Sequence, residues 1–373
     1  MMSEPSKSWS STPGRLRSLD AARGLAVVGM IVVNWATIVD YLRLGPVPRQ
    51  LLHAEWVGIT LADLVFPAFV FLMGMSFALR SPTSAVSPIT AGAWFRAIRL
   101  FAAGWLLSNL HWIVSPDGEA FRLLGVLQRL ALVQISVALL VAYTSPRLQA
   151  RIVLAVLVGY WLLLLAPTPT GQPPDLNSPG TNFVSWFDRF VLGRHIYVRG
   201  EAGYDPEGIL GTLPAIAQCL LGVQAGRWLR TGHTALNIAA GLAAAGLVSV
   251  ALGLLWSPLL PISKPLWSSS FVLLTTGVTL FVFALIYWVV DVYRRGGPTT
   301  AFLEAFGLNA ITAYILHSLM LTAMTAAAAR LLLAGPRSSA ETLLAVVLSF
   351  VGLVGFTWSV AAYLRRRGII VRI

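Results

Sequence analysis

The chain has 373 residues, of which 57% are hydrophobic and 11% are charged, and its formal net charge is +12. A soluble domain carries about 25% charged residues, so this composition excludes an ordinary soluble enzyme and favours a membrane protein. The basic residues gather at the ends of apolar stretches, as they do where positive loops stay on the cytoplasmic side of a membrane, and the charge therefore does not indicate a nucleic-acid partner.

The chain opens with a polar, serine-rich segment that lacks the apolar core of a cleaved signal peptide, and we expect residues 1–18 to form a cytoplasmic tail. Apolar stretches of roughly 20 residues, the length that crosses a bilayer as a helix, then recur through 19–373. No short alternating strands of a barrel interrupt them. We therefore predict an all-α, polytopic integral membrane helical bundle of about ten transmembrane helices. The expected spans are 19–37, 59–79, 93–113, 121–143, 151–166, 208–229, 235–256, 267–291, 302–324 and 341–363.

The distribution of charge orients this bundle. With the N terminus in the cytoplasm, most Lys and Arg residues fall in inner loops and most Asp and Glu residues fall in outer loops. Both termini are then cytoplasmic, and the long loop 167–207 lies outside. This loop opens with the Pro- and Gly-rich APTPTGQPPDLNSPG and continues with NFVSWFDRFVLGRHIY, an aromatic amphipathic stretch suited to the bilayer surface. The single cysteine, Cys219, excludes a disulfide within the chain.

Ionisable and amide side chains inside apolar spans are expensive, so each is a candidate functional residue. Asp20 and Arg23 lie three residues apart in RSLDAARGLAVVGM and share one helix face. They form either a helix cap with a local salt bridge or a cytoplasmic-side site for an anionic ligand, with Arg23 as the phosphate partner. Asn34, at the end of the same span, is either a polar interfacial residue or an amide that stabilises an oxyanion.

The segment LLHAEWVGITLADLVFPAFVFLMG places an acid inside a span and a histidine at its mouth. His53, beside Trp56, is either an interfacial histidine bonded to backbone or a base or nucleophile, since histidine titrates near neutral pH. Asp63 lies about one turn into the span. It is expected to orient a neighbouring histidine, or to form a buried ion pair with Arg122 or Arg129.

Further polar groups lie toward the outer half of later spans. Asp205 and Glu207, in GYDPEGILGTLPAI, form either a capped helix start or a carboxylate pair for a cationic or polyhydroxylated ligand. Lys264, Asn309 and His317 add weaker candidates. The sequence carries no HExxH, no cysteine cluster, no Walker A motif and no GxSxG, so we predict no metal.

Several long blocks resemble one family in its own order: RLRSLDAARGLAVVGMIVVNW, LLHAEWVGITLADLVFPAFVFLMG, RLLGVLQRLAL, YDPEGILGTLPAI, SKPLWSSSFVL and RRRGIIVRI. Together they resemble the transmembrane acetyltransferases that include heparan-α-glucosaminide N-acetyltransferase and its bacterial NagX-type relatives. The resemblance runs from about residue 15 to 373. It implies transfer of acetyl from cytoplasmic acetyl-CoA to the amine of a glucosamine-like hexosamine across the membrane, by a homodimer in the bacterial inner membrane.

The resemblance also assigns roles. It makes His53 and Asn34 the catalytic residues. Together with this resemblance, the polar groups of the outer half become substrate-binding candidates. They are Asp63, Trp56, Asp205, Glu207, Lys264 and His317. Asp20, Arg23 and Asn309 become candidates for binding acetyl-CoA.

The chain departs from the family at Val57, where Trp-Asn-Gly is common, and the large lumenal domain of the lysosomal enzyme has no counterpart in this sequence. A free amino sugar, an envelope oligosaccharide or another amine or hydroxyl is therefore expected as acceptor, in place of heparan sulfate. O-acetylation of an envelope glycan and transport of an amino sugar remain the alternative functions. The residues leave direct transfer and an acetyl-histidine intermediate equally open.

Overall fold

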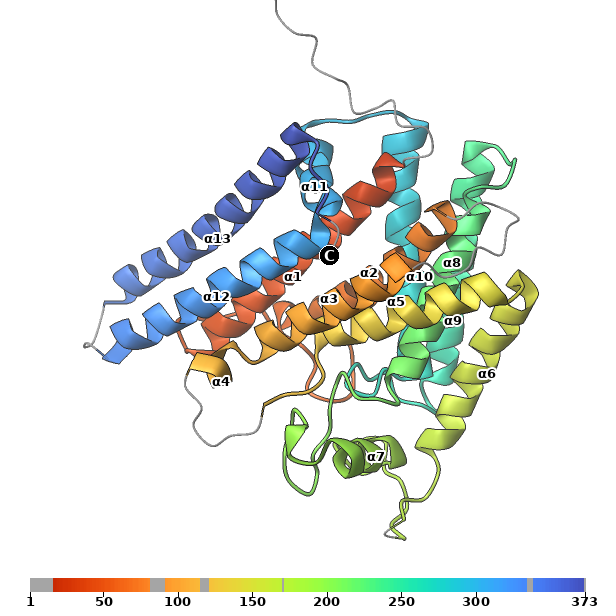
Figure 1. Cartoon of the computed structure of the whole chain (residues 1–373), viewed down its shortest axis with the longest axis horizontal. Helices are drawn as coiled ribbons and strands as arrows, with labels where there is room; N and C mark the ends of the chain where they lie inside the picture. Colours follow the sequence, from red (N-terminus) through yellow and green to blue (C-terminus); the bar gives the residue numbers. More distant parts are fainter. Residues whose placement is uncertain (1–15, 81–90, 115–120, 170, 334–337, 372–373) are drawn as a thin grey trace, which may run out of the picture.

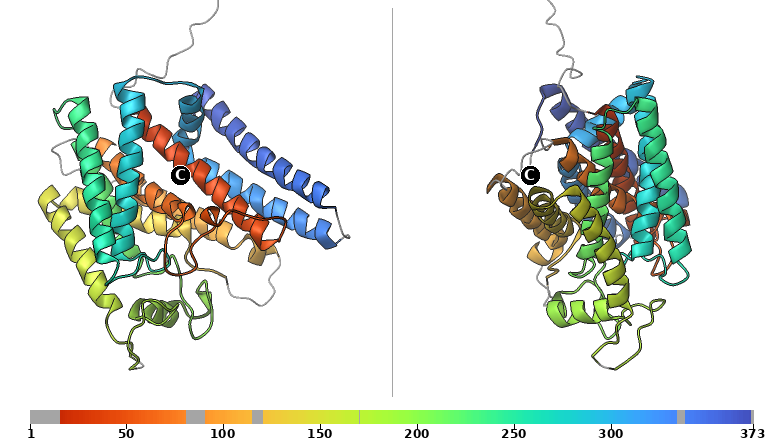
Figure 2. Two further views of the ribbon diagram at one scale, coloured as in Figure 1. Left: turned by 180° about the vertical axis from the view of Figure 1, so that it is seen from behind. Right: turned by 90° about the vertical axis from the view of Figure 1, so that its right-hand side faces the viewer.

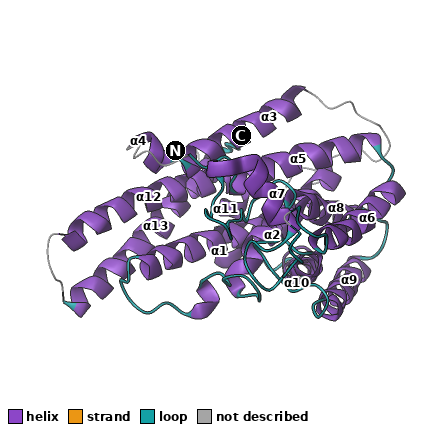
Figure 3. Cartoon of the chain, turned by 90° about the horizontal axis from the view of Figure 1, so that it is seen from below, coloured by secondary structure: helices purple, strands orange, loops and turns teal. Residues whose placement is uncertain are grey.

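The protein is described by a computed structural model over residues 16–80, 91–114, 121–169, 171–333 and 338–371. In these ranges every regular element is a helix, apart from one isolated bridge between Val198 and Tyr204 (Figures 1 and 3). The expected cytoplasmic tail lies almost wholly outside the described residues. The α-helices are α1 (Arg17–Tyr41), α2 (Leu61–Arg80), α3 (Ala91–Ser108), α4 (Leu110–Val114), α5 (Val126–Tyr143), α6 (Pro146–Leu164), α7 (Phe183–Leu192), α8 (Thr212–Trp228), α9 (Ala235–Trp256), α10 (Ser269–Tyr287), α11 (Pro298–Leu308), α12 (Ala310–Leu333) and α13 (Ser339–Arg367).

Within the described ranges, eight helices are long and apolar enough to cross a membrane: α1, α2, α5, α6, α9, α10, α12 and α13. The protein is therefore a multi-pass helical membrane protein, as predicted. The other two expected spans fall on α3, which carries Arg96 and Arg99, and on α8, which has 17 residues. The expected span 208–229 begins late because residues 208–211 form turns ahead of α8.

Two expected spans are broken, and the stretch 93–113 divides at Asn109 into α3 and α4. The stretch 302–324 divides at Asn309 into α11 and α12. The Asn309 amide N–H donates to the Ile369 carbonyl at 3.1 Å, and its carbonyl accepts from the Val371 N–H at 2.8 Å. Asn309 thus joins the break to the segment that follows α13. A continuous apolar pattern gives no sign of this interruption, because it depends on a contact with the far end of the chain.

The centre of the bundle is a close contact between α2 and α8. Gly74 of α2 lies against the Cys219 carbonyl, and Gly222 of α8 lies against the Phe71 carbonyl, so close that a Cβ atom at either glycine would collide with backbone. Small residues at such contacts let helix backbones approach and gain van der Waals packing, which is the main attraction between helices in lipid. The contact fixes α2, whose first turn carries Asp63.

At one end of the bundle three connecting segments meet (Figures 1 and 2). They are 42–60 before α2, 165–211 around α7, and 257–268 before α10. The Gly58 N–H donates to the Ile262 carbonyl at 2.8 Å, and the indole N–H of Trp56 donates to the Leu176 carbonyl at 3.0 Å. We call this the loop end of the bundle.

Helix α7 at the loop end is amphipathic, as expected. Its outward face carries Phe190, which is 73% exposed and stacks on Trp186, whereas Asp188 on its inner face is buried. That α7 lies on a bilayer surface stays a prediction.

The opposite end of the bundle joins the first and last helices. Glu304 of α11 accepts from Arg17 of α1 at 2.7 Å and from Arg365 of α13 at 2.5 Å. The described chain therefore begins and ends its helical part at the same end of the bundle, which agrees with both termini lying on one side of the membrane. That this side is the cytoplasm stays a prediction.

Candidate active site

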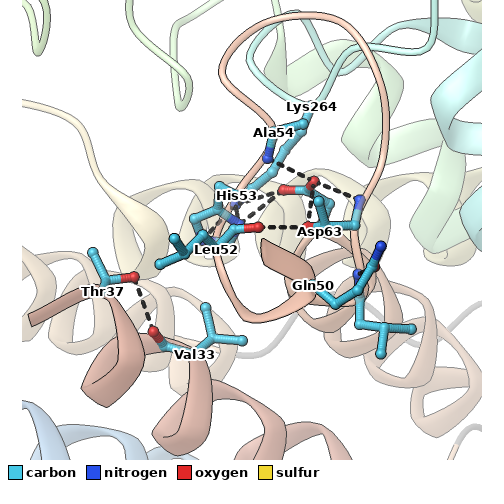
Figure 4. A network of polar contacts seen from close by, with 10 residues as sticks. Val33, Thr37, Gln50, Leu52, His53, Ala54, Asp63 and Lys264 are labelled. Atoms are coloured by element: carbon cyan, nitrogen blue, oxygen red, sulfur yellow. Dashed lines mark hydrogen bonds and ion pairs between the residues drawn. The ribbon is translucent and has the colours of Figure 1, made fainter. Parts of the chain in front are cut away.

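The Asp63 carboxylate at the loop end is surrounded by hydrogen-bonding groups. Asp63 lies in the first turn of α2 and its side chain is fully buried. Its Oδ2 atom accepts from the Ala54 N–H at 3.1 Å and from the Thr60 N–H at 3.0 Å, and the Thr60 hydroxyl oxygen lies 3.0 Å from the same atom (Figure 4). Its Oδ1 atom lies 2.8 Å from Nδ1 of His53. The contacts with Ala54 and Thr60 fix the carboxylate, and the contact between its Oδ1 atom and Nδ1 then fixes the position of the His53 ring.

His53 is consequently held in one tautomer. With Nδ1–H donating to the Asp63 carboxylate, Nε2 carries the lone pair. The side chain remains 39% exposed, so a ligand can approach it. An imidazole oriented by a buried carboxylate is the arrangement that general bases and nucleophiles use in acyl transfer. The prediction that Asp63 orients a neighbouring histidine is confirmed by this contact.

Lys264 completes a three-residue network from segments far apart in the chain (Figure 4). Its Nζ atom lies 2.9 Å from Nδ1 and 3.0 Å from Nε2 of His53, and 3.7 Å from Oδ1 of Asp63. Burial lowers the pKa of the Lys264 ammonium below its usual range, while the charges of Asp63 and Glu207 act in the opposite direction. The network therefore holds an imidazole, a carboxylate and an amine within contact of one another.

The backbone after Lys264 is constrained. The Trp267 N–H donates to the Lys264 carbonyl at 2.9 Å, and Trp267 has a φ of 51°, an unfavourable value for a bulky residue. Its indole N–H donates to Gln218 at 3.1 Å, and its ring lies under the Arg129 guanidinium, 5.0 Å away. Strained residues persist where surrounding structure over-determines them, and they cluster at functional sites.

The alternative expectation for Asp63, an ion pair with Arg122 or Arg129, is wrong. Arg122 bonds Asp205 at 3.2 Å and Glu207 at 2.5 Å. Arg129 donates to the Gly208 carbonyl at 3.3 Å. Arg122 lies in the segment that leads into α5, and Arg129 lies in the first turn of α5. Both side chains therefore contact the turn that precedes α8, and not the first turn of α2, where Asp63 lies.

Asp205 and Glu207 are buried partners of Arg122. The expectation that they cap a helix start is wrong, because α8 begins at Thr212 and its N-cap, Gly211, has no side-chain cap. Burial raises the pKa of Asp205. Burial acts to raise the pKa of Glu207 as well, but the charges of Arg122, Arg129 and Lys264 together outweigh it, and the pKa lies below its usual range. Their role in binding substrate stays a prediction.

Asn34 lies against His317. The His317 Nδ1–H donates to the Ala313 carbonyl at 3.2 Å, so its Nε2 accepts from the Asn34 amide at 3.0 Å. This contact joins α1 to α12. Trp35, which follows Asn34 in α1, lines an apolar groove of about 260 Å³. Among the described contacts, none joins Asn34 to His53. The catalytic role of Asn34 and the substrate-binding role of His317 stay predictions.

Trp56 and Asn309 have clear packing roles. The Trp56 ring is buried and meets Tyr204 edge to face at 4.7 Å, which fixes the segment that carries His53. Asn309 holds the end of the chain through both sides of its amide. Whether Trp56 also contacts substrate, or Asn309 a cofactor, stays a prediction.

The expected salt bridge between Asp20 and Arg23 is present at 3.6 Å, and Arg23 also contacts Ser76 of α2. The pair lies in the first two turns of α1, toward the end of the bundle opposite the loop end. Binding of acetyl-CoA there stays a prediction.

As for metals, the described part of the chain holds no group of three or more His, Cys, Asp and Glu side chains able to bind one.

Sequence reasoning missed Gln218 as a residue that supports the site. This fully buried amide on α8 accepts from Trp267 and donates to Thr275 at 2.9 Å. An amide inside an apolar helix, flanked by Ala217 and Cys219, was the signal that could have identified it.

Comparison with known proteins places these residues in context. The family model described as "Heparan-alpha-glucosaminide N-acetyltransferase, catalytic" matches residues 15–254. A human protein named heparan-alpha-glucosaminide N-acetyltransferase is 33% identical over 365 residues, covering 83% of this chain and 53% of the human chain. The mouse protein of that name is 30% identical over 367 residues, covering 83% and 54%. The chain thus spans about half the length of the curated relatives it matches.

Proposed function

Because the chain belongs to the heparan-alpha-glucosaminide N-acetyltransferase catalytic family, we propose that it transfers acetyl from cytoplasmic acetyl-CoA to the amine of a glucosamine-like hexosamine on the other side of the membrane. The observation that carries this proposal is the His53–Asp63 pair, with Nε2 of His53 bearing a lone pair at the accessible loop end. Both residues lie within the segment that the family model matches.

In this proposal His53 takes a proton from the acceptor amine as the amine attacks the acetyl thioester. Asp63 orients the ring through Nδ1 and stabilises the positive charge that the ring acquires. The relatives' name, which specifies N-acetyl transfer, favours an amine over a hydroxyl as acceptor. An acetyl group carried on Nε2 is the alternative route with the same residues.

The donor is proposed to enter from the end of the bundle opposite the loop end. CoA is polyanionic and its phosphates do not enter hydrocarbon, so Arg23, paired with Asp20, and the inner arginines are proposed to hold them. The thioester arm then reaches between helices toward His53, and Asn34 donates to the developing oxyanion after leaving His317. Asn309 is proposed to support the donor from the break between α11 and α12.

The acceptor is proposed to enter at the loop end. Glu207 places a negative charge near Lys264, and in this proposal Asp205, Glu207 and Trp56 line the approach to His53. His317 is proposed to contact substrate on the Asn34 side. The setting that we propose is the bacterial inner membrane, with both termini cytoplasmic, a homodimeric assembly and NagX-type proteins as bacterial relatives.

The test uses purified full-length protein, radiolabelled acetyl-CoA, and glucosamine beside a panel of other amines and sugars. We expect label in an acid-stable N-acetyl product, and a loss of at least about 10²-fold in His53→Ala. His233→Ala, a change at an exposed histidine in another loop, is the matched control and should retain activity. No transfer to any acceptor would overturn the enzyme function, whereas undiminished transfer by His53→Ala would overturn the role of His53.

A further inference from the structure

Lysine is rare in this chain. Of its 27 lysine and arginine residues, two are lysines, Lys7 and Lys264. Arginine supplies positive charge almost everywhere else, including the buried pairs of Arg122. A guanidinium stays protonated and is a poor nucleophile, whereas a lysine amine can lose its proton and attack a carbonyl. The position where the chain uses an amine in place of a guanidinium is therefore informative.

The Lys264 amine lies where the acceptor amine of the proposed reaction is needed. Its Nζ atom lies 2.9 Å from Nδ1 and 3.0 Å from Nε2 of His53, so the amine stands directly beside the general base of the proposed reaction. The side chain is 14% exposed, and burial lowers the pKa of its ammonium, which increases the fraction of neutral amine. Asp63 and Glu207 act against this shift, and Arg129 acts with it.

We propose that Lys264 is a self-acetylation site: when no acceptor amine is bound, Nζ of Lys264 accepts the acetyl group of the thioester donor. This inference rests on the proposed function, since it needs that donor at His53. The neutral amine attacks the thioester carbonyl, a C–N bond forms, and His53 Nε2 takes one proton from the nitrogen. The C–S bond then breaks, and the departing thiolate takes the proton from His53. The products are an N-acetyl-lysine amide and free CoA thiol.

Acetylation at Lys264 has a predictable consequence for the site. The amide carries no charge, so the ion pair with Asp63, 3.7 Å away, is lost. The added acetyl group also occupies the space beside His53 Nε2. An amide does not return its acetyl group as a thioester or acetyl-imidazole does, so the modified protein is blocked. Acetylation of Lys264 therefore inactivates the protein whenever acetyl donor is abundant and acceptor is scarce, and bound acceptor protects against it.

The experiment incubates purified full-length protein with deuterated acetyl-CoA in the absence of acceptor, followed by peptide mass spectrometry of both lysines. We expect label to accumulate at Lys264 faster than at Lys7, and glucosamine to suppress labelling at Lys264 alone. His53→Ala and heat-denatured protein should label both lysines equally and slowly. Lys7→Arg should leave labelling of Lys264 unchanged. Remaining transfer activity should fall in proportion to the fraction of Lys264 acetylated.

The same preparation is assayed for transfer to glucosamine, which separates the two proposals. Active protein whose Lys264 stays unlabelled overturns self-acetylation and leaves the proposed function intact. Equal labelling of Lys7 and Lys264, insensitive to His53→Ala, also overturns it, because this is the pattern of uncatalysed chemical acetylation. Absence of both transfer and labelling overturns the proposed function, and self-acetylation with it.

Discussion

Nδ1 of His53 lies 2.8 Å from a carboxylate oxygen of Asp63, a side chain that is fully buried in the first turn of α2. The two residues are ten positions apart, and the turn between them is closed by the Thr60 hydroxyl, which donates to the Leu52 carbonyl at 2.7 Å. The histidine is therefore positioned by the start of a central helix, although it lies on a loop. Its orientation depends on Asp63 more than on its own neighbours in sequence.

Replacing Asp63 with Asn should lower kcat by about 10²–10⁴-fold, because the amide no longer selects the tautomer with a lone pair on Nε2. The measurement is steady-state transfer to glucosamine. Asp175→Asn is the matched control, since Asp175 is an exposed carboxylate that accepts from the Ser178 hydroxyl at the loop end. A kcat within about twofold of wild type in a folded Asp63→Asn protein would contradict the role of Asp63.

Asn34 and His317 should behave as one unit. Removing His317 leaves the Asn34 amide N–H without the partner that it has at 3.0 Å, and removing Asn34 frees the His317 ring. In a double-mutant cycle of Asn34→Ala and His317→Ala, measured as kcat/KM, we expect a coupling free energy of about 0.5–3 kcal/mol.

The control cycle pairs His317→Ala with Thr37→Val, since the Thr37 hydroxyl donates to the Val33 carbonyl within α1. That cycle should be additive. Additive effects in the cycle of Asn34 with His317 would show that the contact between them does not serve the reaction.

The parts of the site that sequence could predict are the local ones. His53 and Asp63 flank the start of one helix, so an acid in an apolar span beside a histidine was a sufficient signal. Lys264 lies 211 residues from His53, and the two meet because loop 42–60 bonds loop 257–268 at Gly58 and Ile262. Such contacts depend on tertiary packing, and they cannot be predicted from the hydropathy pattern of the sequence.

The predicted helices agree with the fold where the length of an apolar stretch sets the ends of a helix. They differ from it where a polar contact with a distant segment interrupts the helix. The span 235–256 matches α9 residue for residue. The span 302–324 fails at Asn309, whose amide bonds a tail 60 residues away. The pairing of Asp205 and Glu207 with Arg122 was hidden for the same reason, since the pattern of a capped helix start is local and the arginine that neutralises them is distant in sequence.

Arg122→Met should destabilise the protein by about 3–5 kcal/mol, because it leaves Asp205 and Glu207 buried without their shared partner. The measurement is the half-life of monodisperse protein on heating in detergent. Arg194→Met, at an exposed arginine that follows α7, is the control and should cost less than about 0.5 kcal/mol. Equal half-lives for the two variants would contradict a stabilising role for this buried cluster.

Asp188 should make stability fall as pH rises. Burial, reinforced by Asp205, raises the pKa of Asp188 from 3.8 to about 7, although the Ile209 N–H bond opposes the shift. In the unfolded chain this carboxyl ionises near pH 4, whereas in the fold it stays neutral until about pH 7, so unfolding releases a proton in this window and its contribution to stability declines between the two values. Asp188→Asn keeps an acceptor for Ile209 and removes the titration. Its thermal stability relative to wild type should therefore increase from about pH 4 to about pH 7 and then level off. A stability difference that is constant across this range would show that Asp188 titrates alike in the folded and unfolded protein.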